Sequence, residues 1–470
     1  MRIGRATALI VALLFAAGTL ALLPRLAAWV VGRDVVAQSE RERSAYEHGR
    51  SPWEWTFRSA DDLVAGRVFG HASVAGGTEG LALTGGDGSP VELGLPLIRA
   101  VDLTQLPRLR LDMSAPPGTS LRFAVRERLD GPKVTTDAAT FGPDTAPLVV
   151  PLSGLSWKDE QGHDTAAPTR AAMFRLVLPM APGAAITLRT ATFQPGSPPA
   201  PELTRTVALP PASDAETLLR WRDTLWEGQP TTMFGPATTR LPVTAVNAGY
   251  RDWIALALYL AGLLWLSWRP PVSRPGKTLE AVAGVLGPLW LIAGMRLDAH
   301  PSVPAAVCFA AGIVFAGALA GRRRLPPWTW LGSPIAIALP LLAIPAATLL
   351  VALLGHAPVW PPAGRIFLYV GWALLQQWLM LAVTAALLDR LLPRPLTLLV
   401  TALTFALLHT PNGSLMQLCF IAELGWAWCF LRYRALLPVA LAHAASAVLL
   451  QAGLAGGVLR SLEVSARFLN

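Results

Sequence analysis

Long apolar runs alternate with short polar loops throughout the second half of the chain. Eight such runs cover residues 253–268, 279–295, 304–320, 331–354, 366–388, 396–409, 415–431 and 436–454, and a ninth covers residues 6–31. A helix that crosses a bilayer needs about 20 consecutive apolar residues, and shorter runs tilt or enter it in part. The pattern therefore predicts a polytopic α-helical membrane protein with about nine spans.

The N-terminal run has two interpretations. Arg2 and Arg5 precede it, and the small residues at 17–21 resemble the cleavage region of a signal peptide. The apolar stretch continues to Val31, however, which is close to the length of a spanning helix. We favour an uncleaved transmembrane anchor over residues 1–32, with a cleaved signal peptide as the alternative.

Residues 33–247 have a different pattern, in which apolar and polar residues alternate over short stretches. Eight stretches alternate in this way: 67–74, 81–84, 91–97, 108–113, 120–128, 147–152, 173–178 and 185–193. Gly-Gly, Asp-Gly and Pro-Gly turns stand between them, which is typical of an antiparallel β-sandwich. The stretches 152–157, 174–178 and 186–193 resemble the closing strands of jelly-roll carbohydrate-binding modules. Residues 213–227 have helical spacing, and a linker rich in Pro and Thr follows.

Composition agrees with a membrane protein and excludes other classes. Hydrophobic residues make up 53% of the chain and charged residues 15%, against about 25% charged residues in a typical globular protein. These values exclude a disordered protein, a coiled coil and most cytosolic enzymes. Cys308, Cys419 and Cys429 all lie in apolar runs, so we expect buried thiols and no disulfide framework.

The positive charge follows the pattern of a membrane protein. The chain has 39 basic and 30 acidic residues, and the excess falls after residue 250, where 15 basic residues accompany 6 acidic ones. Arg2, Arg5 and the loops 269–277, 322–324, 390–394 and 432–434 place twelve basic residues on one predicted side, whereas short loops on the other side hold only Arg296 and Arg365. By the positive-inside rule, the N-terminus is cytoplasmic and residues 33–247 are extracytoplasmic. Because the basic residues lie at the ends of apolar runs, we expect a membrane protein with no nucleic-acid partner, and the scarcity of lysine indicates a GC-rich bacterial genome, which gives a bacterial inner (plasma) membrane.

Several polar residues inside the apolar runs are candidates for a functional site. His409 ends one run and His443 lies within another, whereas the other five histidines lie in the β-domain or in outer loops. Polar groups within a bilayer are costly and generally face the interior of a helix bundle. Two neutral imidazoles on neighbouring spans can bind a divalent metal such as zinc, and a structural hydrogen-bonding role is the alternative. Gln376 and Gln377 form a polar pair in a third run, and Glu423 lies in the middle of a fourth.

These residues also form an ordered set of motifs. Gln376 and Gln377 come first, Phe405 and His409 then form an FxxxH element, and His443 follows about 30 residues later. The order resembles that of the CPBP family of intramembrane metalloproteases, which includes the type 2 CAAX prenyl endopeptidases and bacteriocin-immunity relatives. Over residues 361–454 the resemblance implies a membrane endopeptidase with EExxxR, FxxxH and HxxxN/D motifs. In that family the first Glu and the histidines activate a water with a metal, and the Asn stabilises the oxyanion.

The sequence departs from this family pattern at the positions that carry the chemistry. Gln376 and Gln377 replace the Glu pair, Leu381 replaces the Arg, and Ala447 replaces the Asn or Asp, with Ser446 beside it. A Gln amide cannot act as a general base, and general-base catalysis typically contributes about 10²–10⁴ in rate. The family mechanism should therefore be impaired. Glu423 has two interpretations: a relocated base that partners a histidine, or a neutral hydrogen-bonding group in the bundle.

Three functions follow from these observations. The first is a CPBP-type intramembrane endopeptidase acting on a membrane protein or peptide, with the β-sandwich recruiting it. The second is a non-catalytic relative, a pseudoenzyme that binds or scaffolds a membrane partner. The third is an envelope component whose β-sandwich binds a glycan or an envelope protein. The predicted domains are an anchor (1–32), a jelly-roll-like β-sandwich (33–247), membrane helices (248–360) and a CPBP-like core with an amphipathic tail (361–470).

Overall fold

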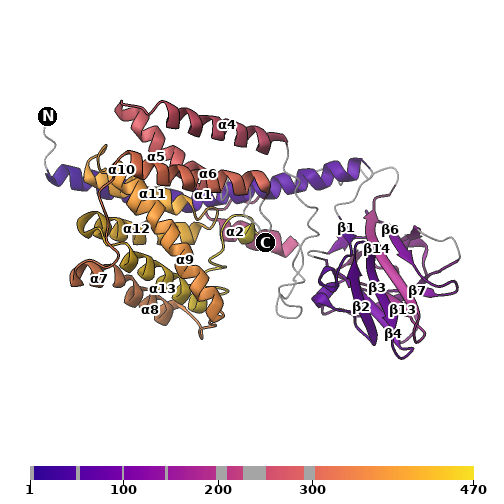
Figure 1. Cartoon of the computed structure of the whole chain (residues 1–470). Helices are drawn as coiled ribbons and strands as arrows, with labels where there is room; N and C mark the ends of the chain where they lie inside the picture. Colours follow the sequence, from indigo (N-terminus) through magenta and orange to yellow (C-terminus); the bar gives the residue numbers. More distant parts are fainter. Residues whose placement is uncertain are drawn as a thin grey trace. The chain divides into compact units, whose positions relative to one another are not determined.

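A computed structural model describes residues 5–48, 53–97, 100–142, 147–196, 209–225, 250–289 and 302–469 (Figure 1). The chain forms two compact units. The helical unit comprises Met1–Gly32, Pro211–Leu218 and Val246–Asn470, and the β unit comprises Arg33–Pro210 and Leu219–Ala245. Helix α1 (Arg5–Glu47) and helix α2 (Ala215–Leu225) each contribute residues to both units.

The β unit consists mainly of two antiparallel sheets. One contains β1 (Glu54–Thr56), β2 (Ala72–Gly77), β3 (Gly80–Gly85), β6 (Arg108–Ser114), β9 (Leu148–Pro151) and β14 (Ala185–Gln194). The other contains β4 (Pro90–Leu95), β7 (Ser120–Arg126), β8 (Val134–Thr140), β10 (Trp157–Lys158), β11 (Asp164–Thr165) and β13 (Met173–Pro179). Strands β5 (Val101–Asp102) and β12 (Arg170–Ala171) form a separate pair.

The order of the strands is that of a jelly roll. The first sheet runs β3-β14-β6-β9 and the second runs β4-β13-β7-β8, so strands far apart in sequence are neighbours in each sheet. This double Greek-key arrangement is the one that jelly-roll proteins share. The strand pattern of the sequence therefore predicted the antiparallel sheets. The order of the strands, in which the chain crosses from one sheet to the other, comes from the structure.

Alternating apolar residues close the space between the two sheets. Phe174 of β13 and Phe193 of β14 are fully buried, and their rings meet edge to face at 5.2 Å. Trp55 of β1 packs on Phe193 at 5.8 Å. Strand β8 was not predicted, because it is rich in Thr and Ala and buries little of its side-chain surface. The predicted stretch 67–74 was partly wrong, since β2 begins only at Ala72.

The helical unit contains the long apolar helices of the chain (Figure 1). They are α4 (Tyr250–Trp268), α5 (Arg274–Leu289), α6 (Val303–Arg322), α7 (Pro334–Leu341), α8 (Ala343–Leu354), α9 (Ala363–Gln377), α11 (Arg394–Leu407), α12 (Gly413–Tyr433) and α13 (Leu437–Leu454). A π-helical stretch η7 (Trp378–Ala385) and the short α10 (Ala386–Leu388) continue α9. Helix α1 joins this unit through Gln417 of α12, whose amide donates to the carbonyl of Leu20 at 2.8 Å.

Within the described ranges, six helical segments are long and apolar enough to cross a membrane. They are Ile10–Ala37, Val303–Arg322, Pro334–Leu354, Ala363–Leu388, Gly413–Tyr433 and Leu437–Leu454. Asp252–Trp268 and Arg394–Leu407 are apolar but shorter. The predicted run 279–295 is described only to Leu289, because residues 290–301 lie outside the described ranges. The chain is therefore a helical membrane protein, and the count of nine spans stays a prediction.

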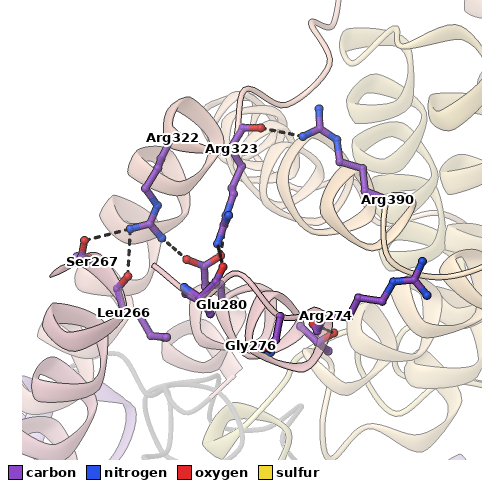
Figure 2. A network of polar contacts seen from close by, with 11 residues as sticks. Leu266, Ser267, Arg274, Gly276, Glu280, Arg322, Arg323 and Arg390 are labelled. Carbon is purple, nitrogen blue, oxygen red and sulfur yellow. Dashed lines mark hydrogen bonds and ion pairs between the residues drawn. The ribbon is translucent and has the colours of Figure 1, made fainter. Parts of the chain in front are cut away.

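A buried ion-pair network joins α5 to α6 in this unit (Figure 2). The fully buried carboxylate of Glu280 accepts hydrogen bonds from the guanidinium groups of Arg322 and Arg323. Arg322 also donates to the Leu266 carbonyl of α4 at 3.1 Å. Arg390, beyond α10, donates to the Arg323 carbonyl at 2.8 Å. One carboxylate thus holds several helix ends together on the predicted cytoplasmic side.

The C-terminal segment, residues 455–469, differs from the predicted amphipathic helix. Only α14 (Ala466–Leu469) is helical there. The amide of Asn412 donates to the backbone carbonyls of Ser461 at 2.7 Å and Glu463 at 3.1 Å, and the Ser465 N–H donates to the carbonyl of Thr410 at 2.9 Å. Backbone groups of the C-terminal segment are thus hydrogen-bonded to Thr410 and Asn412, which precede α12. The segment therefore packs there in an irregular conformation and not as a helix.

Candidate functional site

A cavity of about 1450 Å³ lies inside the helical unit. Its wall is formed by residues of α7, α8, α9, α12 and α13, by Leu408 and His409 after α11, and by the C-terminal segment. Most of these residues are apolar. Phe367 of α9 and Ile421 of α12 line the cavity while remaining 78% and 56% exposed, so the cavity reaches a side of the bundle that is apolar.

The structure brings the candidate residues together from four elements. Gln376, at the end of α9, lines the cavity with His409 and His443 of α13. The histidines are more than nine-tenths buried. Gln377 and Glu423 of α12 are fully buried and do not belong to the cavity wall. The site therefore has three candidates on the wall and two behind it.

Gln377 connects Glu423 to His443. Its amide nitrogen Nε2 donates to Glu423 Oε2 at 3.1 Å and lies 3.3 Å from His443 Nδ1. Because an amide nitrogen is only a donor, this orientation of the Gln377 amide assigns Nδ1 of His443 as the acceptor and its Nε2 as the nitrogen that carries the ring hydrogen. Glu423 Oε1 and Gln377 Oε1 have no hydrogen-bond partner among the described residues. Among the described residues, the carboxylate of Glu423 is therefore hydrogen-bonded to a neutral amide and to no imidazole.

The FxxxH element has a structural explanation. His409 Nδ1 donates to the backbone carbonyl of Phe405, four residues earlier, at 2.8 Å. Its Nε2 is then the nitrogen that keeps a lone pair. The ring of Phe405 meets the edges of His409 at 4.8 Å and of His443 at 5.4 Å, so one aromatic side chain positions both imidazoles. His409 thus presents an acceptor, and His443 presents a donor.

The positions that depart from the family pattern are occupied in different ways. Leu381, in the π-helical stretch, is fully buried in a hydrophobic cluster, where an arginine would need a carboxylate partner. Ala447 lines the cavity and offers no polar group. Ser446 beside it also lines the cavity, is 7% exposed, and has an Oγ without a hydrogen-bond partner within the described part of the chain. Buried polar atoms normally have a hydrogen-bond partner, so this hydroxyl is available to bond to a molecule in the cavity.

Sequence reasoning missed several residues of the cavity. Trp426 packs on the His443 ring at 5.3 Å. Arg365 lines the cavity at the start of α9, and Glu463 and Arg467 of the C-terminal segment line it as an ion pair at 3.8 Å. Nothing in the local sequence marks these residues, because they are a tryptophan in an apolar run and charges at the ends of runs. Only the tertiary structure brings them to one cavity.

The side chains do not fit a zinc centre with several protein ligands. Zinc is usually held by three or four His, Cys, Asp or Glu side chains. No group of three or more such side chains could hold a metal ion in the parts of the chain that the structure describes. As placed, the Nδ1 of His443 accepts from the amide of Gln377 and its other nitrogen carries the hydrogen, which leaves no lone pair free for a metal. Metal binding by His409 and His443 stays a prediction.

His356 fastens the loop after α8 to the start of the C-terminal segment. Its Nδ1 bonds to the carbonyl of Ala357 and its Nε2 to that of Ala455, both at 2.9 Å. Two carbonyl acceptors require both ring nitrogens to donate, which only the charged imidazolium can do. These two hydrogen bonds raise the pKa of His356 above its ordinary value of about 6.5.

We expect the raised pKa of His356 to make this fastening depend on pH. A group whose pKa is raised on folding stabilises the folded state below its unfolded pKa and loses that contribution as pH rises through the folded pKa. Thermal unfolding of the detergent-solubilised protein should therefore show a small loss of stability above about pH 6.5 that is absent in His356→Gln. Parallel pH profiles for the two proteins would contradict this role.

Comparison with protein families agrees with the motif order. Residues 328–449 match the model of the family described as type II CAAX prenyl endopeptidase Rce1-like. The match covers about a quarter of the chain and includes all five candidate residues. Comparisons with curated proteins and with solved structures gave no match. The family resemblance is thus confirmed for the C-terminal part of the chain.

Proposed function

We propose that this CAAX-endopeptidase-like membrane protein binds an amphiphilic membrane molecule or peptide in its cavity without hydrolysing it. The observation that carries the proposal is the position of the carboxylate. Gln376 is on the cavity wall, where the family's base would act, and Glu423 is behind Gln377 with no place on the wall. The pseudoenzyme interpretation of the sequence is therefore the one that the geometry favours.

Each alternative base is disfavoured by its hydrogen bonds. His443 accepts at Nδ1 and carries a hydrogen on Nε2, so neither nitrogen is free to take a proton from water. His409 retains a lone pair, but its Nδ1 donates to a backbone carbonyl and not to a carboxylate. A histidine base is normally oriented and stabilised by a carboxylate in its charged form. Glu463, the one carboxylate on the described wall, pairs with Arg467.

The apolar wall supports binding as the retained activity. A largely apolar pocket with a few converging polar groups is the usual form of a small-molecule site. Gln376, His409, His443 and Ser446 supply those polar groups here, and the exposed side chains of Phe367 and Ile421 mark an entrance from the bilayer. The ligand is thus a membrane-resident amphiphile or a hydrophobic peptide segment.

The proposal also includes the membrane topology of the protein and the role of its β unit. The protein crosses a bacterial inner membrane about nine times, with a cytoplasmic N-terminus and an extracytoplasmic β unit, because basic residues recur in alternate loops. The jelly roll recruits a partner there, a glycan or an envelope protein. A jelly roll does not by itself define a ligand.

The proposal is tested by incubating the reconstituted protein with membrane-spanning and lipidated peptides and identifying products by mass spectrometry. We expect no cleavage by the wild type, since losing general-base catalysis alone lowers rates by about 10²–10⁴. Gln376→Glu alone should not restore cleavage, because Leu381 and Ala447 still lack the family's polar groups. Cleavage that is lost in Glu423→Gln or His409→Ala would instead establish an active enzyme with a relocated base.

A further inference from the structure

The polar groups on the cavity wall define what kind of head group they can bind. His443 offers the hydrogen on Nε2 as a donor, because Gln377 occupies its Nδ1. His409 offers the lone pair on Nε2 as an acceptor, because its Nδ1 is bonded to Phe405. Ser446, one helical turn after His443, adds a hydroxyl that has no partner among the described residues. These three side chains therefore present two donors and one acceptor.

The three side chains are all more than nine-tenths buried. A ligand that forms hydrogen bonds with their unpaired polar atoms is therefore strongly preferred over one that does not. His409, His443 and Ser446 are 8%, 7% and 7% exposed. Leaving a buried donor or acceptor without a partner costs about 1–3 kcal/mol. A charged head group would also lose its hydration beside these three side chains, where the two neutral imidazoles provide no countercharge. The charged residues of the wall, Arg365, Glu463 and Arg467, lie instead at the start of α9 and in the C-terminal segment. The complementary ligand is thus uncharged and carries both a carbonyl oxygen and an N–H or O–H.

On this basis, and resting on the proposed binding function, we infer that the cavity binds the amide head of a single-chain acyl amide lipid. The amide C=O accepts from His443 Nε2 and Ser446 Oγ, and the amide N–H donates to His409 Nε2. The acyl chain lies along the apolar wall that ends at Phe367 and Ile421. This assignment uses every unpaired polar atom of the three side chains.

A lipid amide fits these groups better than a peptide that spans the membrane. The backbone amides of a spanning helix are bonded within the helix, and unwinding one inside the bilayer costs several kcal/mol for each exposed group. A lipid amide has a free donor and a free acceptor without such unwinding. It also enters sideways from the bilayer, where Phe367 and Ile421 are exposed.

The test compares two photoreactive lipids in proteoliposomes of phosphatidylcholine. One is stearamide and the other methyl stearate, each with a diazirine in the middle of the chain, and labelled residues are located by mass spectrometry. Both have the carbonyl, but only the amide has the N–H that His409 accepts. One buried hydrogen bond corresponds to about a three- to tenfold difference, so we expect the amide to label the cavity wall that much more strongly than the ester.

Variants assign the preference to individual side chains. His409→Phe should reduce the ratio of amide to ester labelling to about one. Ser446→Ala should weaken labelling by both lipids while leaving the ratio unchanged, because it removes a donor to the shared carbonyl. Thr404→Ala is the matched control: its hydroxyl already donates to the Val400 carbonyl at 2.8 Å and is not on the cavity wall, so it should change nothing.

The possible outcomes separate the inference from the proposed function. Equal labelling of the cavity by amide and ester in the wild type would overturn the head-group assignment and leave cavity binding intact. A preference that survives in folded His409→Phe would also overturn it. If neither lipid labels the wall, lipid binding as a whole is contradicted. If His409→Phe does not fold, the wild-type ratio and Ser446→Ala still decide the inference.

Discussion

Replacing Glu280 with Ala is expected to destabilise the helical unit by about 3 kcal/mol or more. Glu280 is fully buried, and its two oxygens accept from Arg322 and Arg323, which are only 27% and 20% exposed. Removing the carboxylate leaves two positive charges with little solvent and no acidic partner among the described residues. Removing one partner of a buried ion pair is strongly destabilising for this reason. Thermal unfolding of the detergent-solubilised protein should show a large drop in midpoint.

The matched control is Glu463→Gln. Glu463 pairs with Arg467 at 3.8 Å, and the two side chains are 39% and 45% exposed. Such exposed pairs contribute about 0–1 kcal/mol, so the control should shift the midpoint little. Glu280→Gln, which keeps the shape but not the charge, should resemble the Ala variant. Similar small shifts for all three variants would show that the network does not hold the helices together.

Protease added to intact spheroplasts is expected to remove the β unit completely and to spare the helical unit. The reason is the charge of the loops: loops 269–277, 322–324, 390–394 and 432–434 each carry two or three basic residues and fall on one predicted side. Immunoblots against a tag at each terminus show the sizes of the fragments that remain. A β unit that stays intact until the cells are lysed would reverse the assigned orientation.

The sequence predicted those parts of the structure that depend on local pattern. Apolar runs of sufficient length gave the long helices, and alternation gave most strands of the β unit. Strand β8 escaped prediction because its seven residues, Val134–Thr140, bury mainly Thr136 and lack an apolar face. The C-terminal segment was predicted as a helix from its apolar spacing, but Asn412 binds two of its carbonyls and holds it in an irregular conformation.

The candidate site shows the same division. The motif order predicted which residues to examine, because FxxxH and a second intramembrane histidine are local signals. It did not distinguish Gln376 from Gln377, although one lines the cavity and the other is buried against Glu423. Nor did it reveal that Ser446 is unpartnered or that Arg365 and Glu463 reach the same cavity. Those facts depend on the packing of four helices, which no single segment encodes.

We propose that the cavity has kept the histidines of the family pattern and lost its base, and one measurement tests this proposal most directly. Purified wild type and the His409→Ala/His443→Ala variant are reconstituted side by side with a lipidated membrane peptide, and cleavage products are quantified by mass spectrometry. We expect the same absence of product from both proteins above a blank membrane. Product formed by the wild type and abolished in the double variant would contradict the account, because the histidines would then support catalysis.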